Sequence, residues 1–396
     1  MKAEVKELPL ETMDLQMGPS HPATHGTIKF NLRLEGEKVL ACDTEVGYLH
    51  RGFDKMSEQA TWTQVIPYTD RLNYVSPLIN NVGYALAVEK LLGVETPPRC
   101  QFIRVLVSEI SRITDHLTCC GMACSELGAV TAGFYMIEAR ELLTRIVEAL
   151  TGARLTVSYV RIGGLKHDLP AGFHEQVASA FAKTRRILAD CDKLLSRNRI
   201  FIDRMSNVGV ISKETALDYG LTGPILRSTG VDYDVRKAQP YLVYDQMDFT
   251  VPLGTRGDNY DRFVCRIEEI EQSIRIVEQA LDRLPMGPIS IDDPLIVLPE
   301  KEKVYNSIEG LMHHFKIIME GVQVPPGEVY LPVEGGNGEL GFYVVSQGGG
   351  RPYRLRVRPP CFIAMGAFHE MIRGYTVADI VPTFGMINMI GGECDR

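Results

Sequence analysis

Hydrophobic residues follow two different repeats along the chain, one near its ends and another in its middle. Close to the start, apolar and polar residues alternate over 28–34, which is the period of a strand that buries one face. A turn at 35–37 leads into a second short apolar stretch, so a hairpin is predicted. A second hairpin is predicted near the C-terminus, around a run of three glycines. The four predicted strands are 28–34, 39–42, 341–346 and 353–358.

Between these hairpins the apolar residues recur with the 3.6-residue period of amphipathic helices. Gly93, Gly152 and Gly321 follow three of these stretches, as C-terminal caps do. The predicted helices are about 77–92, 101–117, 134–150, 173–196, 259–284 and 302–320. This order predicts an α+β fold in which a central helical bundle carries small antiparallel sheets at its ends.

The chain shows no internal repeat and no low-complexity linker. We expect a β-rich segment over 1–75, a helical core over 76–330, and a hairpin and tail over 331–396 that return to that core. Although 396 residues are many for a single core, the three regions are expected to form one composite domain.

Charge and hydropathy exclude several classes of function. The formal net charge is -8, so nothing global favours nucleic acid. Arg354, Arg356 and Arg358 alternate with apolar residues without interleaved aromatics, which favours a face toward an acidic partner or plain solvation. No apolar stretch approaches the roughly 18 to 20 residues that span a bilayer, and the charged first residues lack a signal-peptide core. We therefore expect a chain that neither crosses a membrane nor is exported.

The nine cysteines contain no C-x-x-C pair. This scatter indicates a reducing compartment and argues against a disulfide framework, a zinc site or an iron–sulfur cluster held by this chain. Cys119, Cys120 and Cys124 are close in sequence, but we interpret them as small buried residues of a helix. We also expect no flavin or dinucleotide site on this chain.

The clearest candidate for chemistry is the segment G-P-S-H-P-A-T-H-G at 18–26. Its prolines stiffen the backbone, so His21 and His25 are presented from a rigid loop. Imidazole exchanges a proton near neutral pH, which suits acid–base chemistry. Taken alone, the segment also fits two loop histidines that are hydrogen-bonded to the backbone.

Several further motifs follow in a fixed order, and together they carry a resemblance that no one of them would. The chain closely resembles, from about residue 14 to 396, the 49 kDa or D subunit family of the proton-pumping NADH:quinone oxidoreductase, respiratory complex I. The motifs are T-E-V-G-Y-L-H-R-G-F-D-K at 44–55, Y-T-D-R-L-N-Y at 68–74, R-I-G-G-L-K-H-D-L-P at 161–170, L-T-G-P at 221–224, G-V-D-Y-D-V-R-K at 230–237, G-E-L-G-F at 338–342 and the terminal D-R.

The resemblance implies a fold similar to the large subunit of nickel–iron hydrogenases, which hold their metal with two cysteine pairs. The N-terminal counterpart, around His50 to Phe53, has no cysteine, and Cys394 is alone at the other end. One thiolate cannot replace four, so the ancestral pocket is expected to bind no metal and to accept an organic substrate.

The resemblance also implies the site residues. His25 and Tyr74 match the residues that hold the quinone head group, and both can donate a hydrogen bond to a carbonyl oxygen. Glu126 stands where the family has an acidic residue that orients the histidine, although a solvated helix residue is the alternative. Arg71 matches an arginine close to the neighbouring subunit's terminal iron–sulfur cluster. Thr156 replaces a common histidine, which implies a lower and less pH-dependent cluster potential.

Glu109, Arg112 and His116 lie at i, i+3 and i+7 and therefore on one helix face. A salt-bridge stripe is the ordinary interpretation. The resemblance adds a second one, in which these residues form a buried polar seam beside the site and support it.

Taken together, the resemblance implies the quinone-site subunit of a proton-translocating NADH:quinone oxidoreductase, inactive alone. Quinone is its substrate, and no metal, flavin or iron–sulfur cluster is expected on this chain. Its expected partners are the B subunit with the terminal 4Fe-4S cluster, the C subunit and the membrane H subunit, on the cytoplasmic side of a bacterial inner membrane. The alternatives are a hydrogenase-like large subunit and a non-catalytic scaffold.

Overall fold

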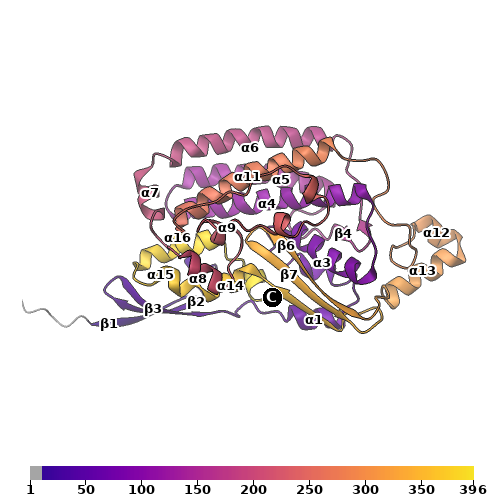
Figure 1. Ribbon diagram of the computed structural model, residues 1–396, viewed down its shortest axis with the longest axis horizontal. Coiled ribbons are helices and arrows are strands. Elements are labelled where there is room, and N and C mark those ends of the chain that lie inside the picture. Colours follow the sequence, from indigo (N-terminus) through magenta and orange to yellow (C-terminus); the bar gives the residue numbers. More distant parts are fainter. Residues whose placement is uncertain (1–10) are drawn as a thin grey trace, which may run out of the picture.

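The computed structural model describes residues 11–396, in which long helices form one layer and two three-stranded antiparallel sheets lie beneath it (Figure 1). The predicted α+β architecture is confirmed. The sheets do not cap the bundle, however, because both lie along the same side of it (Figure 1). The helical layer contains α4 (Pro98–Glu126), α5 (Val130–Thr151), α6 (Phe173–Leu195) and α11 (Asn259–Asp282). Helix α3 (Pro77–Leu92) packs between α4 and the C-terminal sheet.

Local signals account for the helix ends that were predicted best. Helix α3 has the predicted bounds, because Pro77 opens its first turn and Gly93 closes it in the left-handed conformation, φ 68°. Gly152 ends α5 in the same way, φ 83°.

Three predicted helices are wrong in extent; one of them, α5, begins at Val130 rather than near the predicted 134. Helix α4 was expected to end near 117 but continues to Glu126, because Cys119, Cys120 and Cys124 stay buried along it. The predicted helix 302–320 is two helices, α12 (Lys301–Asn306) and α13 (Ile308–Met319). They are separated by Ser307, which has an extended backbone and whose side chain accepts from Gly310 N as a new N-cap.

The N-terminal sheet contains the predicted hairpin and one strand that was missed. Strands β2 (Lys29–Glu35) and β3 (Lys38–Glu45) pair across the turn at Gly36. Strand β1 (Thr12–Met17) adds antiparallel to β2. Because all but the last residue of β1 is exposed, it has no buried face that a hydrophobic pattern could reveal.

The C-terminal sheet also gains a strand. The predicted pair is β7 (Gly338–Ser346) with β8 (Arg354–Arg358), and β6 (Gly327–Gly335) pairs with the other edge of β7. Helix α3 packs on β6 and β7, and Gly83 permits this approach: a Cβ there would lie 2.9 Å from Phe342 and Val333 side-chain atoms.

Two of the three arginines of β8 bond within the chain. Arg356 Nη1 donates to Asp54 Oδ2 at 3.3 Å, and Arg358 donates to the carbonyls of Glu339 and Gly220. Arg356 stays 53% exposed, so its bond to Asp54 is a surface ion pair, and a face toward an acidic partner stays a prediction.

The end of the chain packs against its beginning. Phe30 of β2 stacks on Phe368 at 4.7 Å between ring centroids and meets Phe384 edge-on at 5.7 Å. These aromatic contacts join β2 to α15 and α16 in one hydrophobic cluster. The remaining elements are η1 (Pro22–Thr24), α1 (Phe53–Gln59), α2 (Ile66–Thr69), β4 (Val160–Arg161), β5 (Gly164–Leu165), α7 (Arg199–Met205), α8 (Lys213–Asp218), α9 (Gly223–Arg227), α10 (Val235–Ala238), η2 (Tyr244–Gln246), α14 (Pro360–Gly366), α15 (Phe368–Ile372), α16 (Val377–Ile387) and α17 (Gly391–Cys394).

Within the described part of the chain, none of the helices combines the length and the apolar character needed to cross a membrane.

Candidate functional site

The histidine loop is held by its own hydrogen bonds. His21 is the N-cap of η1, and its Nδ1 accepts from Ala23 N at 3.2 Å. Thr24, fully buried, donates its hydroxyl to the carbonyls of Pro19 and His21. His21 therefore serves the loop, while His25 follows the turn in a left-handed conformation, φ 52°, with its ring free to act elsewhere.

His25 lies between an acidic side chain and an aromatic ring. Its Nε2 is 3.6 Å from Glu126 Oε1, an ion-pair separation that is too long for a hydrogen bond. Its ring meets Phe384 of α16 edge-on at 4.9 Å. The side chain is 36% exposed, so one edge of the imidazole remains accessible. A Cβ at Gly385 would lie 2.9 Å from Glu126 Oε2, so a side chain there would displace this carboxylate.

Tyr74 lies in the tight turn between α2 and α3. Asn73 Oδ1 accepts from the backbone N–H groups of Val75 and Ser76, which closes the turn around Tyr74. Tyr74 is 36% exposed, and partial burial raises the pKa of its phenol above the ordinary value of 10. The phenol is therefore protonated at neutral pH and can donate a hydrogen bond.

Helix α17 lies against both of these segments. A Cβ on Gly391 would come within 2.9 Å of Thr27 Cγ2, two residues after His25. A Cβ on Gly392 would clash with Arg71 O and lie 2.8 Å from Leu72 O, just before Tyr74. The histidine loop and the tyrosine turn therefore flank adjacent glycines of the same short helix.

The segment with His50 meets the end of the chain. His50 Nδ1 lies 2.7 Å from Asp395 O, and the Asp395 carboxylate accepts from Gly47 N and Leu49 N at 2.9 and 2.8 Å. Arg51 Nη2 donates to Gly392 O at 3.0 Å. The two segments expected to correspond to the hydrogenase cysteine pairs are thus in contact.

Two arginines make the surface beside Tyr74 positive. Arg71 donates Nη1 to Pro67 O at 2.6 Å, and the single carboxylate oxygen within 4 Å of its guanidinium, in the described residues, is Asp70 Oδ2 at 3.8 Å. Arg51 donates to Arg71 O, and burial together with the nearby Arg71 charge lowers its pKa. Thr156 lies half-buried in the loop before β4.

Glu109, Arg112 and His116 are fully buried in α4, so the seam exists, but it faces α11 and the C-terminal sheet. Burial alone would raise the pKa of Glu109, yet the charges of Arg112 and Arg236 outweigh it and lower the value. His116 Nε2 lies 2.7 Å from Glu269 Oε2, and burial lowers the His116 pKa despite this partner.

The bonding partners of these three residues do not include the histidine loop or the tyrosine turn. They lie in α10, α11, η2 and β6. The seam is a buried ion network, and among residues 11–396 it makes no hydrogen bond to the histidine loop or the tyrosine turn, so its support of the site stays a prediction.

A second polar group, missed from sequence, lies directly beneath the tyrosine turn. We call it the Asp115 cluster; its members are Asn73, Ser76, Asp115, Asn337 and Asn388. Glu393 of α17 adjoins it, with Oε2 3.1 Å from Cys361 Sγ, and burial raises the pKa of Glu393 to about 7. The sequence offered one signal for this cluster, because Asn73 is next to Tyr74 and Asp115 is next to His116. It could not show that Asp115 bonds to Asn73 and Asn388, which are distant in sequence.

The residues present offer little to a metal. In residues 11–396 no group of three or more His, Cys, Asp and Glu side chains is placed to hold a metal ion. All nine cysteines are free thiols.

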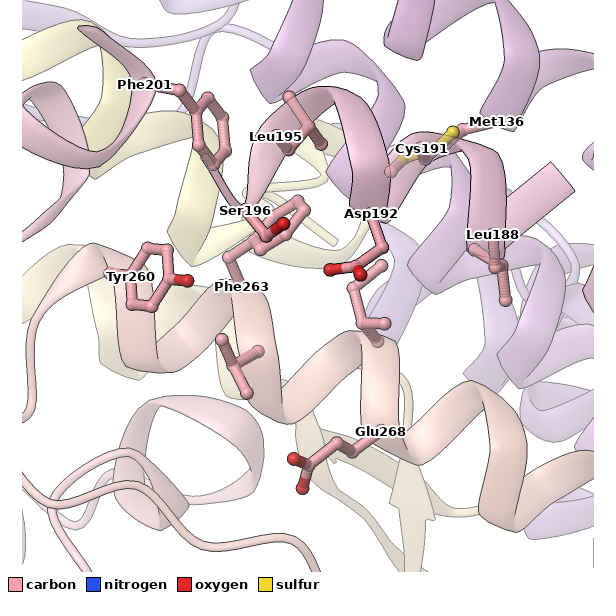
Figure 2. Close-up of a pocket in the computed structure, with 12 residues that line it drawn as sticks. Met136, Leu188, Cys191, Asp192, Leu195, Ser196, Phe201, Tyr260, Phe263 and Glu268 are labelled. Carbon is pink, nitrogen blue, oxygen red and sulfur yellow. The ribbon is translucent and has the colours of Figure 1, made fainter. Parts of the chain in front are cut away.

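The apolar cavity in Figure 2 is a separate feature between α5, α6 and α11, with a volume of about 220 Å³. Its walls include Met136, Leu188 and Phe263, and none of the residues predicted for the site lines it. Its polar lining residues include Asp192, Tyr260 and Glu268, but no histidine lines it.

Comparison with known proteins is consistent over nearly the whole chain. Residues 126–396 match the family described as respiratory-chain NADH dehydrogenase, 49 Kd subunit. The D 1 subunit of the NADH-quinone oxidoreductase of Sorangium cellulosum (strain So ce56) is 57% identical over 391 residues, 98% of this chain and 97% of the relative. The D subunit of the Myxococcus xanthus (strain DK1622) enzyme is 53% identical over 98% of this chain and 94% of its own length.

A third relative carries two subunit names in one protein. The C/D subunit of the NADH-quinone oxidoreductase of Bdellovibrio bacteriovorus (strain ATCC 15356 / DSM 50701 / NCIMB 9529 / HD100) is 49% identical over 384 residues, which cover 97% of this chain and 69% of that protein.

Proposed function

Because the chain belongs to the family of the 49 kDa subunit of respiratory-chain NADH dehydrogenase, we propose that its histidine loop and tyrosine turn bind and protonate the quinone. It is a subunit of an NADH-quinone oxidoreductase, and quinone is the substrate of that complex. The observation that carries the proposal is the packing of both segments against the adjacent glycines of α17.

Quinone reduction adds two electrons and two protons to the two carbonyl oxygens, and the ring leaves as a quinol. His25 and Tyr74 donate hydrogen bonds to these oxygens, and the bonds strengthen as negative charge builds up on them. The raised pKa of Tyr74 keeps its proton available at neutral pH. Glu126, whose Oε1 lies 3.6 Å from His25 Nε2, orients the imidazole ring.

The electrons come from a partner. We propose that the exposed face at Arg71, with Arg51 behind it, receives the B subunit and its terminal 4Fe-4S cluster. A fixed positive charge near a cluster favours its reduced form. Thr156 cannot titrate, so the cluster's potential is expected to depend weakly on pH, which a redox titration at several pH values measures.

The chain's other partners are further members of the complex. The C/D protein of Bdellovibrio supports the C subunit as one of them. We propose the membrane H subunit as another, which would hold this chain at the cytoplasmic face of a bacterial plasma membrane.

We also propose a hydrogenase-like ancestry. The contact between His50 and Asp395 supports it, because these segments were expected to correspond to the two cysteine pairs. A nickel–iron centre requires four thiolates, and Cys394 is the single thiol in these two segments. The position of the ancestral metal pocket, between these two segments, is therefore assigned to an organic substrate.

The test uses the assembled complex. His25→Ala and Tyr74→Phe are expected to lower NADH:quinone reductase activity strongly, while NADH oxidation by a water-soluble acceptor such as hexacyanoferrate is retained. His174→Ala, at an exposed position of α6 outside the loop, is the matched control for the first, and Tyr343→Phe on the exposed side of β7 is the control for the second. Full quinone reduction by both site variants would instead indicate a scaffold role for the chain.

A further inference from the structure

A buried carboxylate of α4 joins the segments that carry the proposed quinone site. Asp115 has no exposed surface. Its Oδ2 accepts hydrogen bonds from Asn73 Nδ2 and Ser76 Oγ, both at 2.9 Å. Its Oδ1 accepts from Asn388 Nδ2 at 2.8 Å. Because Asn73 and Ser76 bracket Tyr74, the carboxylate holds the tyrosine turn from both sides.

Neutral hydrogen-bond donors, rather than a cationic side chain, surround the Asp115 carboxylate. No Lys, Arg or His nitrogen of the described chain lies within ion-pair distance of it, so its direct partners are three neutral donors. A buried ion of this kind is costly unless its lone pairs are satisfied with good geometry. Arg266 is linked to Asp115 only through Asn388 and Asn337, since it donates to Asn337 Oδ1 at 3.4 Å.

The orientation of the cluster amides is locked. Asn337 Oδ1 accepts from Arg266 Nη1 and, at 2.6 Å, from Asn388 Nδ2. Asn337 Nδ2 donates to Asn388 O at 3.0 Å. A flip of either amide would bring two acceptors or two donors together. Asn388 must therefore present its NH₂ group to position 115, and this position must present an acceptor.

We propose that Asp115 is a positioning residue for quinone reduction, which fixes the direction of the Tyr74 phenol by anchoring its turn to α4 and to the C-terminal segment. This inference rests on the function proposed above. Asp115 does not touch the quinone; it acts through Tyr74.

Asp115→Asn tests the inference with almost no change in volume. The new amide has one acceptor, whereas the site needs acceptors toward Asn388 on one side and toward Asn73 and Ser76 on the other. Two donors therefore meet at one of these contacts, and the tyrosine turn shifts. A displacement of about 1 Å in a reacting group lowers rates by on the order of 100-fold, so kcat/KM for quinone should fall by about 10- to 100-fold, with a rise in KM.

A double variant, Asn73→Asp with Asp115→Asn, provides the rescue. The carboxylate moves to the turn, where it can still accept from Val75 N and Ser76 N, as Asn73 Oδ1 does now. Asn at 115 then donates to position 73 and accepts from Asn388. Every hydrogen bond regains a donor and an acceptor, so quinone kinetics should return to within about threefold of the native values.

The measurements are made on the purified complex, with Asp168→Asn as the matched control because Asp168 pairs with Arg99 outside the site. Hexacyanoferrate reduction and the amount of this chain in the complex report assembly. The inference is supported if Asp115→Asn impairs quinone reduction, the double variant restores it, and Asp115→Asn adds little to Tyr74→Phe.

Three results would overturn it. Unchanged quinone kinetics in Asp115→Asn, with Tyr74→Phe impaired, rejects the positioning role and leaves the proposed function standing. Impairment without rescue, or loss of the chain from the complex, shows that Asp115 serves stability alone. Unimpaired Tyr74→Phe rejects the role proposed for Tyr74 and the inference together; unimpaired His25→Ala as well would reject the proposed function.

Discussion

Glu393→Gln tests whether burial of a carboxylate beneath the candidate site makes the stability of the protein depend on pH. Glu393 is 2% exposed, and its carboxylate receives the Cys361 thiol at 3.1 Å and the Asn337 amide at 3.5 Å. Burial raises its pKa from the ordinary 4.5 to about 7, because two weak donors do not replace hydration. Glutamine has nearly the same shape and stays neutral at every pH.

The sign of the effect follows from proton binding. Since the folded pKa is raised, the folded chain holds more protons than the unfolded chain between pH 4.5 and about 7. The contribution of Glu393 to stability is complete below pH 4.5 and is lost as the pH rises through 7. At about 1.4 kcal/mol per unit, the rise in pKa corresponds to on the order of 3 kcal/mol. Glu393→Gln should therefore match the native protein at pH 5 and exceed it in stability at pH 8.

The assay is the apparent unfolding temperature of the purified complex from pH 5 to 8, for the native protein and the variant. Infrared titration should also show a protonated carboxyl band that disappears near pH 7 and is missing in Glu393→Gln. Glu328→Gln, on the exposed start of β6, is the control and should show no pH-dependent difference. A stability difference that stays flat from pH 5 to 8 would refute the reasoning.

Two further changes probe packing and charge. Gly392→Ala should lower quinone reduction at least about tenfold with the chain still assembled in the complex, because the new Cβ would clash with Arg71 O. Gly366→Ala is the control: its Cβ meets no atom within 4 Å, so the same assay should show no change. Arg104→Met should lower the free energy of unfolding, measured with denaturant, by about 3 to 5 kcal/mol, since Glu89 loses bonds of 2.7 and 2.6 Å to the guanidinium and stays buried. Adding Glu89→Leu should recover most of this loss. A failure to recover it would count against a charge effect.

The sequence by itself determined the elements whose signals are local. Helix α3 has its predicted bounds because a proline and a glycine mark its ends, and the two hairpins follow from alternation and a turn. The ordered motifs identified the family and named His25, Tyr74, Glu126 and Arg71 as site candidates. Each of these signals lies within a short stretch of chain, so it survives without knowledge of the fold.

Tertiary structure decided what depends on distant partners. Strand β1 is exposed and exists through backbone pairing with β2, and α4 extends to Glu126 because its cysteines are buried. The Glu109 seam bonds to α11 and its neighbours, although its spacing on one helix could not say which side it faced.

Long-range contacts decided the environment of the candidate site as well. Asp115 bonds to Asn388, 273 residues later, and α17 joins the histidine loop to the tyrosine turn. A buried polar group must find a partner, but any of many polar residues could supply it. Which residue does so depends on the packing of the whole chain. That packing places Asp115 beneath Tyr74, where it bonds to Asn73, Ser76 and Asn388.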